Sequence, residues 1–250
     1  GVSFEYAAGR RVLDAIDLEL EPGRTVALIG HTGSGKTTLA SLVPRFYEAT
    51  EGRVTVDGAD VRELKRSSLR RAIGIVAQDP FLFSATVREN IAFGRADATD
   101  EDVRNAARLA QAHDFIERLP DGYDTVIGER GITLSGGQRQ RIAIARALIM
   151  EPRILIFDDA TASVDATTEA RIRLGLREAM RGRTTLIIAH RLSTIALADE
   201  LVVLDGGRVA ARGTHDELIR TSAVYREIYE HGLLEREFAE RVEARAEVSA

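Results

Sequence analysis

The segment GHTGSGKT, at residues 30–37, limits more than any other feature what this chain can fold into. It fits the phosphate-loop pattern G-x-x-x-x-G-K-[ST], and it follows the apolar run TVALI at residues 25–29. The pattern requires a buried strand, a glycine-rich turn and a helix, because backbone N–H groups and the helix N-terminus must face phosphate oxygens. We therefore predict a nucleotide site in which Lys36 reaches the β- and γ-phosphates and Thr37 offers its hydroxyl to Mg²⁺.

Apolar runs like the one before the phosphate loop recur along the chain. They do not alternate apolar with polar residues, so they predict strands buried on both faces of a mainly parallel sheet. The runs are IGIVAQD at 73–79, RILIFDD at 153–159 and TTLIIAH at 184–190. We therefore expect an α/β fold.

Two other regions have a different character. Residues 1–25 and 52–62 alternate apolar with polar residues between glycine-containing turns, which predicts an N-terminal, mostly antiparallel β subdomain. Between residues 85 and 150 helical signals dominate, which predicts an α-helical lobe inserted into the sheet domain. We expect one domain over residues 1–235, followed by a helical tail at 236–250 that frays.

Local signals locate individual elements within these regions. A helix is expected to begin after an N-cap at Thr99 or Asp100 and to end before Pro120. Near the end of the chain, two β-type runs joined by Gly206 and Gly207 predict a hairpin. The chain opens with GVSFEY, without a methionine, and we expect it to be part of a longer polypeptide.

Composition excludes several classes of function. The 34 basic and 39 acidic side chains give a net charge of −5, so there is no sequence-wide attraction to DNA or RNA phosphates, and we expect no nucleic-acid partner. The chain has no cysteine, which excludes disulfides and thiolate metal sites. No apolar run approaches the roughly 18 to 20 residues that a membrane-spanning helix needs.

Two more segments carry candidate chemistry. The run ILIFD ends in Asp158, which a buried strand could deliver to the water shell of Mg²⁺. The run LSGGQRQR, at 134–141, places a glycine pair at the start of a helix that Ser135 could cap, a second anion-binding helix start. Taken alone, the first motif also fits a strand followed by a turn, and the second also fits an ordinary capped helix.

In their order along the chain, the three motifs resemble those of the nucleotide-binding domain of an ABC transporter. The likeness extends from Tyr6 to about residue 230. The resemblance implies a P-loop NTPase core that binds ATP and Mg²⁺. It also implies a role for each matching residue. Nucleotide binding falls to Tyr6, which stacks on adenine, and to the Walker A loop: Gly30, His31, Thr32, Gly33, Ser34, Gly35, Lys36 and Thr37, with Thr38 beside it. The signature is formed by Leu134, Ser135, Gly136, Gly137 and Gln138, and the D-loop by Ser163–Asp165. Mg²⁺ ligation is implied for Thr37, Gln78 and Asp158, and catalysis for Gln78, Asp159 and the switch histidine His190.

The same resemblance implies partners. In this family two nucleotide-binding domains form a head-to-tail dimer, in which the signature of one closes over the ATP held by the other. The segment YDTVIGERGITLSGGQ, with Glu129 ahead of the signature, is similar to the exporter branch, where it touches the membrane domain. The implied location is the cytoplasmic face of the cell membrane, beside a transmembrane domain.

Asp159 departs from the family pattern, which has glutamate after the Walker B aspartate. The shorter side chain withdraws the carboxylate by about 1 Å, and a displacement of that size can cost on the order of 100-fold in rate. The resemblance then favours the slow-site subunit of a heterodimeric exporter, whose intact LSGGQ serves a partner that bears the glutamate.

Three alternatives stay open at this point. Asp159 could work adequately after a small backbone adjustment. The chain could be a non-hydrolysing, ATP-binding regulatory module that acts by dimerisation. It could also be a soluble ABC ATPase acting on DNA or ribosomes, but the acidic charge and the lack of a long coiled-coil insertion between Lys36 and Asp158 speak against this.

Overall fold

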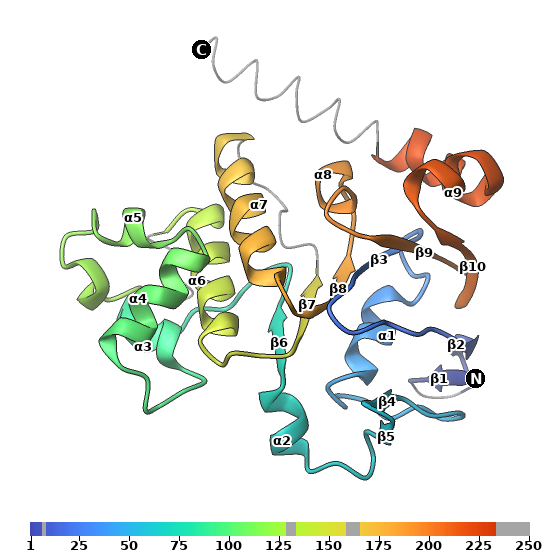
Figure 1. Cartoon of the computed structure of the whole chain (residues 1–250), viewed down its shortest axis with the longest axis horizontal. Helices are drawn as coiled ribbons and strands as arrows, with labels where there is room; N and C mark the ends of the chain where they lie inside the picture. The colour runs from blue at the N-terminus through green and yellow to red at the C-terminus, as the bar shows by residue number, and fades with distance from the viewer. Residues whose placement is uncertain (7–8, 129–133, 159–165, 234–250) are drawn as a thin grey trace. The chain divides into compact units, whose positions relative to one another are not determined.

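The computed structural model describes residues 1–6, 9–128, 134–158 and 166–233 (Figure 1). The chain divides into two compact units: Gly1–Ile73 with Thr184–Ala250, and Gly74–Arg183. The fold is α/β, with mostly parallel sheet strands, antiparallel strand pairs and several helices. The predicted fold class is therefore confirmed.

The first unit is organised around β3 (Thr25–Ile29), the strand that precedes the phosphate loop. All five of its residues are buried, as the unbroken apolar run requires. It pairs in parallel with β8 (Thr184–Ile188) on one side and with β9 (Glu200–Asp205) on the other. The order in this part of the sheet is β9-β3-β8, so the phosphate loop leaves the sheet between two parallel neighbours.

The predicted hairpin is confirmed: β10 (Arg208–Gly213) pairs antiparallel with β9. Its two turn glycines, Gly206 and Gly207, have φ of 53° and 80°, the left-handed conformation that this type of two-residue turn needs.

Antiparallel β structure is also present near the N-terminus. Strand β1 (Val2–Glu5) pairs with β2 (Arg11–Ile16), and β4 (Thr55–Val56) pairs with β5 (Ala59–Asp60). A bridge between Ser3 and Glu51 joins β1 to the segment that leads into β4.

The helices of the first unit are short. Helix α1 follows the phosphate loop and contacts β2 and β8. The hydroxyl of the fully buried Tyr225 is hydrogen-bonded to His215 Nδ1 at 2.6 Å, which ties α9 to α10. The elements are α1 (Lys36–Leu42), α2 (Arg66–Arg71), α8 (Leu192–Ile195), α9 (His215–Thr221), α10 (Ala223–Glu227) and the π-helical turn η3 (Ile228–Leu233).

In the second unit, helices pack around α6 (Gly136–Leu148), which contacts α3, α4 and α7 (Figure 1). The neighbouring strands β6 (Ile73–Val76) and β7 (Ile154–Asp158) contribute the sheet of this unit. The remaining elements are α3 (Val87–Ala92), α4 (Asp100–Leu109), α5 (His113–Ile116), η1 (Gly122–Asp124) and α7 (Ala166–Met180).

The helix predicted to run from Thr99 or Asp100 to Pro120 is interrupted. Thr99 is the N-cap, as one of the two options predicted, but α4 ends at Leu109 and α5 starts only at His113. Gln111 between them has φ of 55°, which no continuous right-handed helix allows. The prediction of a single helix was therefore wrong.

Among the residues that the structure describes, no helix is both long and apolar enough to cross a membrane.

A prediction follows from the capping box before α9. The backbone N–H of Thr214 donates to the Glu217 carboxylate at 2.8 Å, and this bond, with a second from the Thr214 hydroxyl, lowers the pKa of Glu217 below its ordinary 4.5. Stability from this pairing is present above the unfolded pKa and is lost as the pH falls through the lowered native pKa. Glu217→Gln keeps the cap geometry, as Gln138 does at α6, so it should flatten the fall in unfolding free energy between about pH 5 and pH 3.

Urea unfolding at a series of pH values measures that slope. Glu227→Gln, which removes an exposed carboxylate on the next helix, is the matched control. Equal slopes for Glu217→Gln and the unmodified chain would contradict the role of the box.

Candidate functional site

The phosphate loop is built where β3 ends and α1 begins. Gly33 and Gly35 have φ of 84° and 102°, which side chains of L-residues rarely allow. A Cβ at Gly30 would lie 2.2 Å from the Leu204 carbonyl oxygen of β9, and one at Gly35 would lie 2.6 Å from Leu13 Cδ2 of β2. The loop therefore needs glycine both for its turns and for its close packing against two strands.

Lys36 curls back over this loop. Its side chain is only 5% exposed, and its Nζ donates to the carbonyl oxygens of Gly30 at 2.7 Å and of His31 at 2.9 Å. A third, longer bond of 3.4 Å reaches the hydroxyl of Ser34. Burying an ammonium group is costly unless it is hydrogen-bonded, so these bonds stabilise both the charge and the curvature of the loop. The arrangement places a positive charge inside a ring of backbone, which suits an anionic ligand.

The side chains of the loop divide into two sets. Ser34, Lys36 and Thr38 are buried. His31, Thr32, Gly33 and Thr37 are exposed, so they are accessible to a ligand.

Tyr6 and His190 lie in the same unit as the phosphate loop. Tyr6 follows β1, is 53% exposed, and shares a hydrogen bond of 2.9 Å with the hydroxyl of Thr38 in α1. His190 follows β8, and β8 is parallel to β3 with Ile188 opposite Leu28, so His190 leaves the sheet at the edge where the loop begins. Ligands of parallel α/β sheets bind at this carboxyl edge. The structure thus brings together three of the predicted features.

The second unit holds the other described site residues. Gln78 is exposed and follows β6, and Asp158 is the last residue of the neighbouring strand β7. The structure places both, as predicted, just after or at the end of a strand.

Ser135 caps α6, as the sequence predicted. Its hydroxyl accepts from the Gln138 N–H at 3.2 Å, and Gln138 Oε1 accepts from the Ser135 N–H at 2.9 Å. This reciprocal pair fixes the start of the helix. Ser135 is exposed, whereas Gly137, in the first turn of the helix, is buried. An exposed hydroxyl therefore stands at the positive end of a thirteen-residue helix.

Sequence reasoning missed the contacts that α6 makes along its length. Gln140 donates to the carbonyl oxygen of Ala77, next to Gln78, at 3.4 Å. Arg146 donates to the carbonyl oxygens of Phe81 at 2.7 Å and Asn90 at 2.8 Å, and burial lowers its pKa to about 10. The only signal in the sequence was a set of polar residues within an apolar helix, which does not identify their acceptors.

Some predicted residues lie outside the described residues. They are Asp159, the D-loop at Ser163–Asp165 and Glu129. Their assignments stay predictions.

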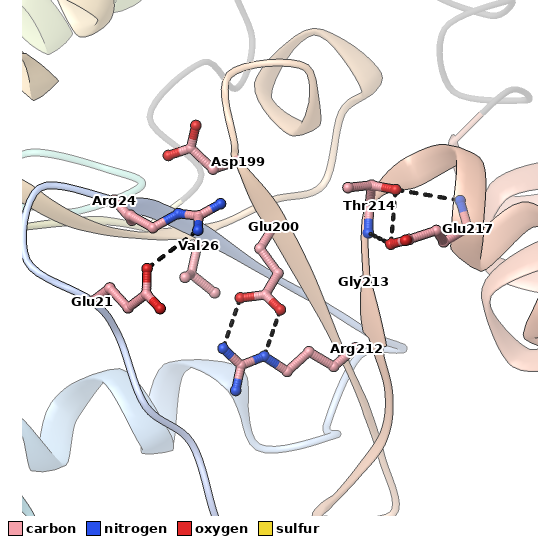
Figure 2. Close-up of a pocket in the computed structure, with 9 residues that line it drawn as sticks. All are labelled: Glu21, Arg24, Val26, Asp199, Glu200, Arg212, Gly213, Thr214 and Glu217. Carbon is pink, nitrogen blue, oxygen red and sulfur yellow. Dashed lines mark hydrogen bonds and ion pairs between the residues drawn. The ribbon is translucent and has the colours of Figure 1, made fainter.

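A separate pocket of about 200 Å³ lies in the first unit (Figure 2). Four of its charges form two ion pairs: Arg212 with Glu200 at 2.5 Å and Arg24 with Glu21 at 3.2 Å. None of the predicted site residues lines it; the lining residues are Glu21, Arg24, Val26, Asp199, Glu200, Arg212, Gly213, Thr214 and Glu217. This pocket is therefore not the phosphate site.

A glycine-dependent loop around a buried lysine, at the carboxyl edge of a parallel sheet, defines a P-loop nucleotide-binding protein. The chain belongs to the ABC transporter family: the family model described as ABC transporter matches residues 13–162.

Curated relatives and a solved structure agree with this membership. The chain is 50% identical over 228 residues to an ATP-dependent lipid A-core flippase of Legionella pneumophila, covering 91% of this chain and 39% of the relative. It is 53% identical over 230 residues to a mitochondrial potassium channel ATP-binding subunit of Rattus norvegicus, covering 91% and 32%. A bacterial Atm1-family ABC exporter with ATP bound matches with a TM-score of 0.86 at 48% identity, covering 91% of this chain and 40% of that one. The chain thus spans about a third to two fifths of the length of these proteins.

Two glycines test how far nucleotide binding depends on the loop geometry. Gly35 and Gly58 both have positive φ, 102° and 80°, but a Cβ at Gly58 would meet nothing within 4 Å. Both alanine variants should share the conformational cost of about 1 kcal/mol. Only Gly35→Ala should also push the loop away from Leu13 and weaken ATP binding by about tenfold or more. Calorimetric titration with ATP measures this, and similar affinities for the two variants would contradict it.

Proposed function

We propose that this chain is the ATP-binding and ATP-hydrolysing domain of an ABC exporter, powering translocation of a substrate through a transmembrane domain. The observation that carries the proposal is the phosphate loop closed around buried Lys36, in a member of the ABC transporter family. Identities of 48% to an exporter of known structure and of 50% to a lipid flippase support the exporter branch.

The residues available fit ATP with Mg²⁺. At Gly33 nothing lies within 4 Å of the Cβ position, which leaves room for a phosphate to approach the backbone, and the Lys36 ammonium already bonds oxygen acceptors in the loop. In this proposal Lys36 holds the β- and γ-phosphates, and the exposed loop residues His31, Thr32 and Gly33 line the approach. Tyr6 stacks on the adenine.

Thr37, Gln78 and Asp158 are the residues that would hold Mg²⁺. The ion, when bound, neutralises charge that develops on the phosphates during transfer. His190 would bond the γ-phosphate and orient the attacking water, as its position at the edge of the sheet allows.

The proposed partners are a second nucleotide-binding domain and a transmembrane domain. The exposed Ser135, at the start of α6, would meet the ATP held by the second domain in a head-to-tail dimer. Assembly with a transmembrane domain places the chain at the cytoplasmic face of the cell membrane. The net charge of −5 gives no support to a nucleic-acid partner.

Asp159 supports a finer proposal, that the chain's own site hydrolyses ATP slowly within a heterodimer whose other member carries glutamate. The same residue also supports the second candidate, a regulatory module that binds ATP, dimerises and does not hydrolyse.

Substitution at Asp159 separates these functions. ATP turnover is measured at high protein concentration for the unmodified chain, for Asp159→Glu, and for Lys36→Ala as the blank. The unmodified chain should lie near the blank, and glutamate should raise turnover by about 100-fold, because it returns the carboxylate to reach of the water. Equal turnover of the unmodified chain and Asp159→Glu, well above the blank, would mean that the aspartate is a working base. No turnover in either would favour the regulatory module.

Ser135 tests the composite dimer in the Asp159→Glu background. Ser135→Ala should leave the ATP affinity of the monomer intact and lower turnover by at least about tenfold, because the hydroxyl serves the opposite site. Thr99→Ala is the matched control, since it removes an N-cap of the same kind from α4 and costs a similar amount of about 1 kcal/mol. Loss of monomer ATP affinity in Ser135→Ala, or equal turnover in both variants, would argue against a composite site.

A further inference from the structure

Three aromatic rings meet beside the phosphate loop. Tyr6 and Phe4 are in T-shaped contact at 4.8 Å between ring centroids, and Tyr6 and Tyr47 are in T-shaped contact at 5.2 Å. Tyr47 also contacts Phe4 at 5.6 Å, so the three rings close a triangle. Phe4 is buried, whereas Tyr6 and Tyr47 are 53% and 46% exposed. The two exposed rings, Tyr6 and Tyr47, therefore both pack against the buried ring of Phe4.

The contacts of Tyr6 restrain different motions. Its hydroxyl is bonded to Thr38 at 2.9 Å, which fixes the far end of the side chain. That bond cannot stop the ring from turning about its long axis, because the hydroxyl oxygen lies on this axis. Only a contact against the ring itself does so, and Phe4 and Tyr47 supply such contacts at interplanar angles of 88° and 84°. The plane that Tyr6 presents therefore depends on these two neighbours.

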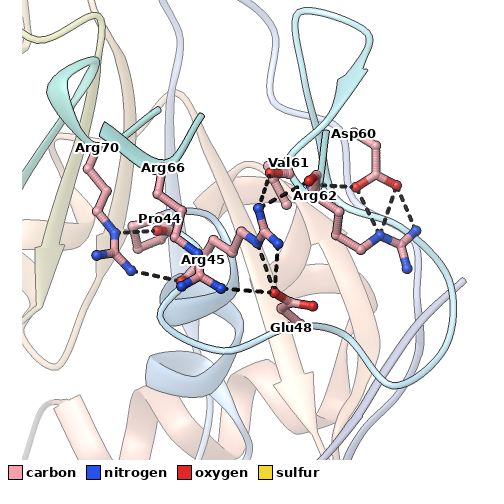
Figure 3. Close-up of polar contacts among 8 residues, drawn as sticks. All are labelled: Pro44, Arg45, Glu48, Asp60, Val61, Arg62, Arg66 and Arg70. Carbon is pink, nitrogen blue, oxygen red and sulfur yellow. Dashed lines mark hydrogen bonds and ion pairs between the residues drawn. The ribbon is translucent and has the colours of Figure 1, made fainter. Parts of the chain in front are cut away.

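The backbone that carries Tyr47 is fixed on its N-terminal side by arginines (Figure 3). Arg70 donates to the carbonyl oxygens of Pro44 at 3.1 Å and Arg45 at 3.0 Å. The guanidinium of Arg45 in turn bonds the Glu48 carboxylate at 2.9 Å and the carbonyl oxygen of Arg62 at 3.1 Å. Arg45 itself holds a left-handed φ of 55°, a conformation that persists in a non-glycine residue when its surroundings impose it.

The other side of the same segment is attached to β1. The Thr50 N–H and hydroxyl both donate to the Ser3 carbonyl oxygen at 2.9 Å, and the Ser3 N–H donates to the Glu51 carbonyl oxygen at 3.1 Å. Ser3 precedes Phe4 in β1. Residues 44–51 thus form a short bridge, fixed at both ends, from α1 to the strand that precedes Tyr6.

We infer that Tyr47 is a positioning residue for the nucleobase: it holds the Tyr6 ring in the plane on which the base of the bound nucleotide stacks. The inference rests on the proposed function, in which Tyr6 stacks on adenine. Fixing the ring before the ligand arrives lowers the entropy lost on binding. Tyr47 should therefore strengthen the binding of the base and leave the binding of the phosphates unchanged. The neighbouring Phe46, 54% exposed, lies instead under the Arg70 guanidinium at 5.2 Å and provides a control of the same size in the same segment.

The experiment compares two ligands by calorimetric titration: ATP, and inorganic tripolyphosphate, which offers phosphates without a base. Tyr47→Ala should weaken ATP binding by about threefold to tenfold, the range of an aromatic pair, and leave tripolyphosphate binding unchanged. Tyr47→Phe keeps the ring and should bind both ligands normally, as should Phe46→Ala. In a double-mutant cycle, Tyr6→Ala combined with Tyr47→Ala should bind ATP no more weakly than Tyr6→Ala alone, because Tyr47 acts through Tyr6.

The opposite results overturn the inference in distinguishable ways. Equal weakening of both ligands by Tyr47→Ala would assign the residue a merely structural role. Additive losses in the cycle would mean that Tyr47 does not act through Tyr6. If Tyr6→Ala leaves ATP affinity unchanged, adenine stacking fails and the inference fails with it; if Lys36→Ala leaves binding of both ligands unchanged, the phosphate-loop assignment itself is wrong.

Discussion

Close backbone packing around the phosphate loop is the constraint on which the rest of the first unit depends. Gly30 admits the carbonyl oxygen of Leu204, Gly35 admits the side chain of Leu13, and Gly207 admits the carbonyl oxygen of Val12. These contacts bring β2, the loop and the β9–β10 hairpin together at three positions that carry no side chain of their own. The Asp14 N–H bond to the Gly207 carbonyl oxygen, at 2.9 Å, belongs to the same contact. A loop fixed from two sides can hold a buried ammonium in one place, which an anion site requires.

In the second unit, α6 has the corresponding role. It extends about 20 Å, from the rise of 1.5 Å per residue. Ser135 caps one end, Gln140 reaches the backbone beside Gln78, and Arg146 near the other end holds the carbonyl oxygens of Phe81 and Asn90. One helix therefore joins Ser135 to the backbone beside Gln78, so these two stretches have a defined position relative to each other within the unit.

Arginine side chains make many of the hydrogen bonds that hold the backbone segments in place. Of the 34 basic residues only Lys36 and Lys65 are lysines, and many arginines bond backbone carbonyl oxygens, as Arg70, Arg141 and Arg146 do. The planar guanidinium presents several donors in a fixed geometry, so one side chain can join two stretches of backbone. The bridge that carries Tyr47 and the segment at Phe81–Asn90 are both held in this way. The single buried Lys36 has a different task, as a compact charge on a flexible stem.

The sequence by itself determined the α/β class, the buried strand before the phosphate loop, the Gly206–Gly207 hairpin and the caps at Thr99 and Ser135. Each of these depends on residues within a few positions of one another, where turn geometry and hydrophobic period act directly. The tertiary structure alone decided the break at Gln111, the acceptors of Arg146, and the meeting of Tyr6 with Thr38 and Tyr47. These contacts join residues 32 to 65 positions apart or depend on a backbone conformation imposed by packing, and no local pattern records which donor will meet which acceptor across such separations.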